Sequence, residues 1–143
     1  MPPSSHAGTL YLVHVLTHAT RARLDDALGG LGLSSFQYTI LSVLSRNAGL
    51  SSARLSRRFH VTPQTMGEVI LLLEKKGLIE RREDPTNKKS LLLGLTTAGA
   101  SVCKTGDGIV TELERRIFDG QSPANIRQLR TILTKALVNL DDK

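Results

Sequence analysis

The chain has 143 residues and a formal net charge of +6; 40% of its residues are apolar but only 3% are aromatic. This length suits one domain, or one domain with an attached helical module, and a core of Leu, Ile, Val and Ala suits helices. No apolar run reaches about 18 residues, the start "MPPSSHAG" lacks the regions of a signal peptide, and the single cysteine excludes an intrachain disulfide. We therefore expect a cytoplasmic protein without a membrane span.

Two amphipathic helices are predicted at the start of the chain. Over residues 7–29 the apolar side chains recur at three- and four-residue spacing, and Gly29 and Gly30 end the segment. In "SSFQYTILSVLSRNAG", Ser34 and Gln37 have the spacing of a capping box and begin a second helix.

A pair of short helices follows, joined by a tight link. "SSARLSRRFH" predicts a helix capped by Ser51 or Ser52. In "VTPQTMGEVILLLEKKG", Thr62 is the expected cap, Pro63 suits the first helical position and Gly77 closes the helix. Two short helices in this arrangement are typical of a helix-turn-helix.

The next segment predicts a β-hairpin. "LIERRE" and "SLLLGL" are short apolar-bearing runs, and the polar "EDPTNKKS" of residues 83–90 joins them. Asp84, Pro85 and Asn87 are turn formers, so we expect a connection longer than a two-residue turn.

Two more helices complete the chain. Thr96 or Thr97 caps a helix that reaches about residue 119, and "SP" at 122–123 starts the last one. Gly106 and Gly108 interrupt the first of these, and each costs about 1 kcal/mol in a helix interior, so we expect a kink or a loosened turn there.

The fold class that follows is mainly α with a small β-hairpin wing. We expect a winged helix-turn-helix with N- and C-terminal dimerisation helices, in which residues 33–96 form the DNA-binding domain and residues 1–32 and 97–143 the dimerisation region, a division that the family resemblance described below implies. The last helix supports this division because its apolar residues exceed what one helix of a small domain needs. These residues are Ile126, Leu129, Ile132, Leu133, Leu137 and Leu140.

Most of the positive charge lies in the predicted winged region. Ten basic and five acidic residues lie between Arg46 and Lys89, and the rest of the chain carries a net +1. Such a concentration indicates a polyanionic partner, although a solvated basic surface remains the alternative.

The stretch from Leu33 to Gly99 resembles the MarR family (multiple antibiotic resistance regulators). Its most specific pieces are "LEKKGLIERREDPTNKK" and, after it, "LTTAG", and the likeness extends over roughly residues 10–140. The resemblance implies a homodimer whose terminal helices intertwine and hold two winged domains over adjacent major grooves of double-stranded DNA. It also implies a repressor that leaves a pseudo-palindromic operator when a small aromatic or phenolic effector binds.

The expected base contacts come from the second helix of the pair. Gln64 can bind adenine, Thr65 can touch a thymine methyl or a phosphate, and Glu68 can accept from cytosine. Arginines on the preceding helix suit phosphate contacts, which set register without reading sequence. The full set of expected DNA-binding residues is Ser52, Arg54, Arg57, Thr62, Gln64, Thr65, Glu68, Arg82, Asn87, Lys88 and Lys89.

This chain departs from the family pattern in two places. The family usually has Thr and a basic residue where Gly67 and Glu68 stand, and an acidic residue followed by arginines where Asn87, Lys88 and Lys89 stand. In addition, Arg81 and Arg82 flank the wing, and one of them has an alternative role as half of a surface ion pair with Glu80 or Glu83.

An effector site is predicted from aromatic side chains near the first two helices. Tyr11, His14, His18 and Tyr38 either line a cleft between the dimerisation helices and the winged domain or pack in the core. His14 and His18 also raise the alternative of a metal sensor, and Cys103 that of a redox sensor, although the surroundings of Cys103 favour a small buried hydrophobe over a sensor.

Other functions have little support in the sequence. It lacks a metal-ligand cluster, a Gly-rich phosphate loop and a catalytic pair of carboxylates, so we expect no enzyme activity, no metal and no cofactor. A winged helix that binds protein or RNA is the alternative from another class.

Overall fold

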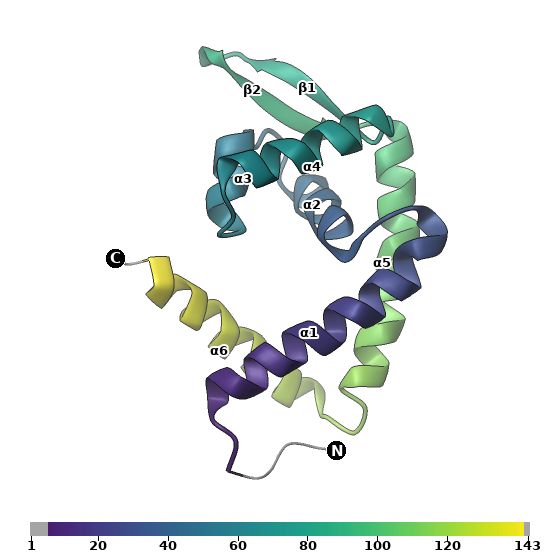
Figure 1. Cartoon of the computed structure of the whole chain (residues 1–143), viewed down its shortest axis with the longest axis vertical. Helices are drawn as coiled ribbons and strands as arrows, with labels where there is room; N and C mark the ends of the chain where they lie inside the picture. The colour runs from purple at the N-terminus through teal and green to yellow at the C-terminus, as the bar shows by residue number, and fades with distance from the viewer. Residues whose placement is uncertain (1–5, 142–143) are drawn as a thin grey trace. The chain divides into compact units, whose positions relative to one another are not determined.

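The computed structural model describes residues 6–141, so part of the "MPPSSHAG" segment lies outside the described residues. The elements follow the predicted order (Figure 1). They are α1 (Thr9–Leu28), the 3-10 turn η1 (Gly29–Leu31), α2 (Ser35–Arg46), α3 (Ser52–Arg58), α4 (Pro63–Lys75), β1 (Ile79–Asp84), β2 (Asn87–Leu95), α5 (Thr97–Ile117) and α6 (Pro123–Asp141).

The starts of α2 to α6 are fixed by side-chain caps that the sequence predicts, whereas α1 begins after Gly8 without one. Ser34 Oγ accepts from Gln37 N at 3.1 Å, while Gln37 Oε1 accepts from Ser34 N at 3.2 Å, which confirms the capping box. Of the two candidates for α3, Ser51 is the cap. The cap of α5 is Thr96, whose Oγ1 accepts from Gly99 N at 3.0 Å.

The chain divides into two compact units, one ending at Val110 and one beginning at Thr111, so the division falls within α5. The first unit holds the core, in which α2, α3, α4 and the base of the hairpin meet. Leu28, Ile40, Leu41, Leu55, Met66, Ile70 and Leu73 are fully buried there. In the second unit, none of the described residues is buried.

Glycine in α5 has a different role from the predicted one. The helix is unbroken from Thr97 to Ile117, so the expectation of a kink or loosened turn is wrong. Gly106 is buried against Tyr38, where an added Cβ would lie 2.7 Å from the ring. Position 106 therefore requires glycine because α5 and the ring of Tyr38 approach each other closely there. This packing outweighs the low helix propensity of glycine.

The hairpin also closes more tightly than expected. Asp84 pairs with Asn87, which leaves Pro85 and Thr86 as a two-residue turn, so the prediction of a longer connection is wrong. The turn is closed because Asp84 Oδ1 accepts from Thr86 N at 2.8 Å and from Thr86 Oγ1 at 2.7 Å. The extra residues are taken up in β2, where the register jumps from Leu91 to Asn87 and residues 88–90 bulge from the ladder.

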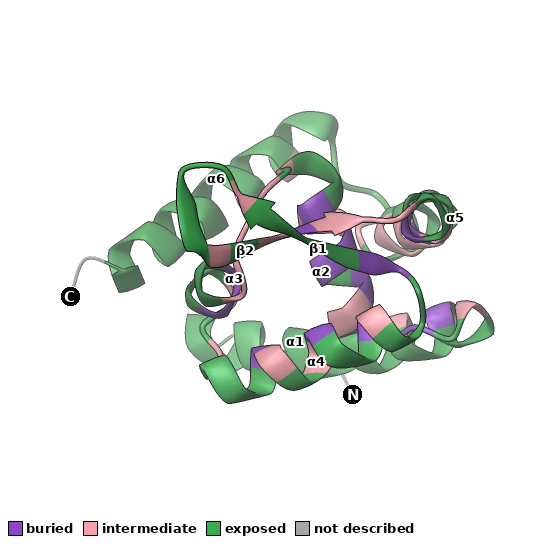
Figure 2. Cartoon of the chain, turned by 90° about the horizontal axis from the view of Figure 1, so that it is seen from above, coloured by how far each residue is buried: buried purple, intermediate pink, exposed green. Residues whose placement is uncertain are grey.

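The base of the hairpin is anchored on the helices, whereas its tip is exposed (Figure 2). Leu93 is buried and its N donates to Leu50 O at 2.9 Å, which joins the α2–α3 link to the hairpin by an isolated antiparallel β-bridge. The hairpin therefore extends outward from a fixed base.

Candidate nucleic-acid interface

Helix α4 has one buried face and one exposed face. Met66, Ile70 and Leu73 are completely buried, while Gln64 and Glu68 lie on the opposite, exposed side. The structure therefore places the predicted base-reading side chains on an open surface, and their contact with DNA stays a prediction.

The start of α4 is organised by a pair of threonines. Thr62 Oγ1 accepts from Thr65 N at 3.1 Å and donates to Thr65 Oγ1 at 2.9 Å. Thr62 is thus occupied as the helix cap, whereas the hydroxyl proton of Thr65 remains available to a partner. Of the two, Thr65 is the better placed for an outside contact.

Helix α3 carries three exposed arginines. Within residues 6–141, Arg54, Arg57 and Arg58 form no ion pair within 4 Å, although the charge of Arg54 acts on the nearby carboxyl of Asp84. Ser52, also expected at the interface, is the first residue of this helix and is only half-buried. A guanidinium without a carboxylate partner is well suited to grip a phosphate with two donors.

Arginines at the base of the wing are paired with carboxylates instead. Arg82 Nη2 lies 2.6 Å from Glu80 Oε1, which confirms the expectation that one of the two arginines forms a surface ion pair with Glu80 or Glu83. Arg81 pairs with Glu74 of α4 at 2.7 Å. Exposed pairs of this kind contribute little stability, so Arg82 can exchange Glu80 for another anion at low cost.

The tip of the wing presents its lysines on the bulge in β2. Asn87, Lys88 and Lys89 are exposed, and Asn87 Oδ1 accepts from Lys89 N at 3.1 Å, so the asparagine shapes the bulge. At the turn, the Thr86 backbone N–H and hydroxyl hold the pKa of Asp84 below its usual range, and the charge of Arg54 on α3 acts in the same direction.

The four residues predicted for an effector site do not form one cleft. Tyr38 has an exposed fraction of only 8%, and its hydroxyl donates to Asp107 within the core of the first unit. Tyr11, His14 and His18 are exposed on α1, where the two imidazole rings form an edge-to-face pair with centroids 4.6 Å apart. None of the four lines the pocket described next.

A pocket of about 480 Å³ lies in the first unit and was missed by sequence reasoning. Its walls come from α1, the start of α2, the α3–α4 link and Thr65. Phe36 and Phe59 form an edge-to-face pair there with ring centroids 5.6 Å apart, and Arg21 is its only charged lining residue. The two phenylalanines are far apart in sequence, so only the three-dimensional structure brings them together.

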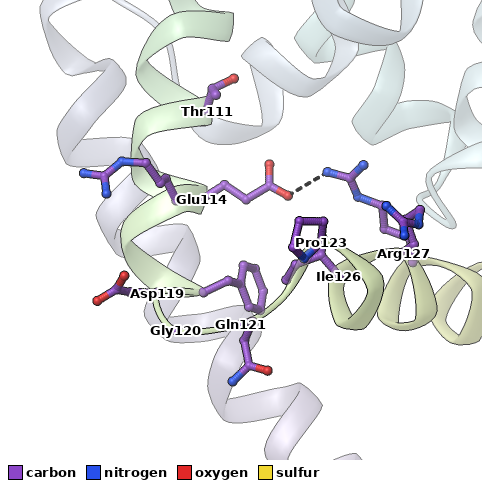
Figure 3. A pocket seen from close by; sticks show the side chains of 11 residues that line it. Thr111, Glu114, Asp119, Gly120, Gln121, Pro123, Ile126 and Arg127 are labelled. Carbon is purple, nitrogen blue, oxygen red and sulfur yellow. Dashed lines mark hydrogen bonds and ion pairs between the residues drawn. The ribbon is translucent and has the colours of Figure 1, made fainter.

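A second pocket of about 620 Å³ lies within the second unit, at the corner between α5 and α6 (Figure 3). Glu114 reaches across it to Arg130, whose Nη2 lies 3.1 Å from Glu114 Oε1. Phe118, Pro123 and Ile126 supply apolar lining, and the walls are exposed or half-buried. Like the pocket of the first unit, this corner is open to solvent rather than an enclosed cavity.

Residues suited to redox or metal sensing are poorly placed for it. Cys103 has an exposed fraction of 2%, and burial, with a further contribution from Asp107, raises the pKa of its thiol. Burial and the hydrogen bond to Asp107 likewise raise the pKa of Tyr38. Over residues 6–141, no three His, Cys, Asp or Glu side chains gather as metal ligands, so His14 and His18 lack a third partner.

No single helix among residues 6–141 has the length and apolar character to cross a membrane. Residues 9–31 and 35–46 meet that test only as a pair, and this pair is bent by 76°.

The helix pair α3–α4 with its adjoining hairpin defines a winged helix-turn-helix protein. A family profile described as the MarR family matches residues 30–90. The HTH-type transcriptional repressor Rv2887 of Mycobacterium tuberculosis is 31% identical over 125 residues, which covers 87% of this chain and 90% of the relative. The chain belongs to the MarR family.

Solved structures agree with this assignment. The S. aureus MepR–DNA complex has a TM-score of 0.80 and 25% identity, and the match covers 96% of this chain and 99% of MepR. The M. tuberculosis MarR family protein Rv2887 in complex with salicylic acid has a TM-score of 0.72 and 30% identity, with coverage of 92% and 98%.

Proposed function

We propose that this chain is a homodimeric, ligand-responsive transcriptional repressor that binds a pseudo-palindromic operator in duplex DNA. One observation carries the proposal: the exposed polar face of α4 lies in the same unit as the unpaired arginines of α3 and the lysine-bearing wing. A helix that reads base edges and basic groups that hold phosphates are the two parts a sequence-specific binder needs. The repressor name of Rv2887 and the DNA bound to MepR support the same reading.

The homodimer is supported by apolar surface on the terminal helices. On α1, Leu10 has an exposed fraction of 83%, and on α6, Ile132 has 58%. Patches of this kind mark interaction surfaces, and α6 has no buried residue although it carries several large apolar side chains. A second copy of the chain would bury these side chains, each with a gain of about 25 cal/mol per Å².

The effector site is proposed in the pocket of the first unit rather than at the four aromatic residues predicted from the sequence. Its phenylalanine pair offers an apolar, aromatic wall, and Arg21 offers a cation for a carboxylate. Rv2887 has been crystallised with salicylic acid, a small aromatic acid. Because Thr65 is part of both this pocket and α4, a ligand there lies beside the DNA-reading surface.

The other candidate functions are weaker. A redox sensor needs an accessible thiolate, whereas Cys103 is buried with a raised pKa. A metal sensor needs further ligands beside the histidine pair. Because a repressor must reach its operator on DNA, the proposal implies that the protein is cytoplasmic. It also implies a binding protein rather than an enzyme.

The test begins with selection of bound duplexes from a random pool, followed by binding titrations over a salt series. Affinity should fall steeply with salt, and an RNA duplex of the same sequence should compete poorly. Gln64→Ala should cost about 1–3 kcal/mol on the selected site and relax preference at one base pair. Arg57→Ala should weaken all duplexes alike and reduce the salt slope by about one.

Three results would contradict parts of the proposal. Equal binding to RNA would favour a different nucleic-acid partner. Uniform effects of both substitutions across sequences would show that Gln64 does not read bases. A monomeric mass by light scattering at micromolar concentration would contradict the homodimer.

A further inference from the structure

Two large apolar side chains are exposed on the helix that is proposed to read DNA. Leu71 and Leu72 of α4 have exposed fractions of 53% and 48%. Gln64, Glu68, Leu71 and Lys75 follow one another at three- and four-residue spacing, so Leu71 belongs to the same exposed stripe as the predicted base-reading residues. Leu72 borders that stripe, opposite the buried Met66, Ile70 and Leu73.

The charge of this stripe is close to zero. The opposite charges of Glu68 and Lys75 cancel, and the carboxylate of Glu74 is already paired with Arg81 of the wing. Attraction to phosphates therefore comes from α3 and the tip of the wing, not from α4. A helix face without net charge gains most by contacts to base edges, where apolar groups and neutral hydrogen-bonding groups are exposed.

We propose that Leu71 and Leu72 contact thymine methyl groups in the major groove of the operator. The inference rests on the proposed function, which brings the exposed face of α4 to DNA. The C5 methyl of thymine is the apolar group that the major-groove edge presents, and it matches a leucine side chain in chemistry. Contact buries both groups from water, whereas a phosphate or a polar base edge would leave the leucines without a matching surface.

The position of these thymines follows from helix geometry. Leu71 comes seven residues after Gln64, which is about 10 Å along the axis at 1.5 Å per residue. A helix that follows the major groove runs obliquely to the DNA axis, so this distance spans at most about three base pairs at 3.4 Å per step. In each half-site, a preferred thymine should therefore lie within about three base pairs of the pair read by Gln64.

Deoxyuridine tests the proposal because it lacks only the C5 methyl of thymine. In the selected duplex, each thymine is replaced singly by deoxyuridine, and binding is measured by fluorescence anisotropy. For the unaltered protein, one or two positions per half-site should lose affinity about fourfold each, the value of one buried methyl group. For the variant with both Leu71→Ala and Leu72→Ala, the loss at those positions should disappear.

Leu91→Ala provides the matched control. Leu91 is an exposed leucine of the wing with an exposed fraction of 44%, and it lies outside α4. Its removal should leave the preference for thymine over uracil unchanged. Because all three leucines are exposed, the variants should fold, and circular dichroism with thermal melting would verify this before the binding comparison.

Two outcomes would overturn the inference. If no deoxyuridine substitution weakens binding, the leucines face another partner, such as a protein. If the double variant keeps the full preference for thymine, that preference arises from DNA shape or another residue. Failure to select any duplex would refute the proposed function itself, and that result is distinct from duplex binding that is indifferent to the methyl group.

Discussion

At Gly99, the addition of a single methyl group by substitution with alanine should lower the stability of the fold more than at other positions. Gly99 lies in the first turn of α5, and an added Cβ would lie 1.9 Å from the carbonyl oxygen of Leu78. That oxygen also accepts from Thr96 N at 3.1 Å, and Thr96 Oγ1 donates to Gly77 O at 2.6 Å. The start of α5 is thus hydrogen-bonded to the link between α4 and the wing, and the glycine permits this close approach.

The cost of Gly99→Ala can be worked from this geometry. Real Cβ atoms stay at least 3.0 Å from a neighbouring backbone atom, so α5 would have to move by more than 1 Å from Leu78. Overpacking of this kind costs about 1–3 kcal/mol, and the strained hydrogen bonds at Thr96 add about 1 kcal/mol. The higher helix propensity of alanine offsets about 1 kcal/mol of this loss in stability. The net loss should be about 1–3 kcal/mol, or roughly 3–10 °C in melting temperature.

Gly108→Ala is the matched control because it lies in the same helix and has nothing within 4 Å of an added Cβ. This variant should be more stable than the original protein by about 1 kcal/mol. Both free energies of unfolding should be measured by urea titration at the same protein concentration, since dimerisation makes stability depend on concentration. Equal stability of the two variants would refute the argument from close approach.

Three further predictions concern reactivity, DNA attraction and pH. Cys103 should react slowly with a thiol reagent in the native protein and quickly in urea, as followed by mass spectrometry, because burial raises the pKa of its thiol. Lys88→Ala with Lys89→Ala should reduce affinity for duplex DNA at low salt and leave the preferred sequence unchanged, and equal affinity would mean that the bulge is only solvated. The backbone N–H of Ser35 holds the pKa of Asp25 below its usual range, and a carboxyl of this kind stabilises the fold above its unfolded pKa of about 4. Asp25→Asn should therefore be less stable at pH 7, and urea titrations should show that the difference shrinks as the pH falls below about 4.

The helix starts could be predicted from sequence because their signals are local. A cap side chain and the backbone N–H that it accepts from lie within three residues, as in Ser34 with Gln37 and Thr62 with Thr65. The order of elements follows from such signals, and the family resemblance, carried by "LTTAG" among others, agrees with it. In the structure, the last residue of that motif is Gly99, whose backbone contact explains why a side chain is excluded there.

Predictions failed where a distant partner decides the outcome. Local propensity predicts that Gly106 weakens α5, but the ring of Tyr38 occupies the space a side chain would need. The aromatic candidates for an effector site were chosen by residue type and stay a prediction. Residue type alone does not reveal the pocket that forms where Phe36 meets Phe59 across two elements. The length of "EDPTNKKS" does not reveal whether its extra residues extend the turn or bulge from a strand.

The bulge has a consequence for how the wing can act. Because the turn itself is only Pro85 and Thr86, the tip has little freedom, and Lys88 and Lys89 project from a strand whose backbone is held by Asn87. Less conformational entropy is then lost when the wing meets DNA than for an eight-residue loop. Lysine is nevertheless a compact, strongly hydrated charge that fits a narrow groove less well than the flat guanidinium of arginine. A stiff wing with lysine charges should therefore supply phosphate attraction without shape readout, which leaves sequence discrimination to α4.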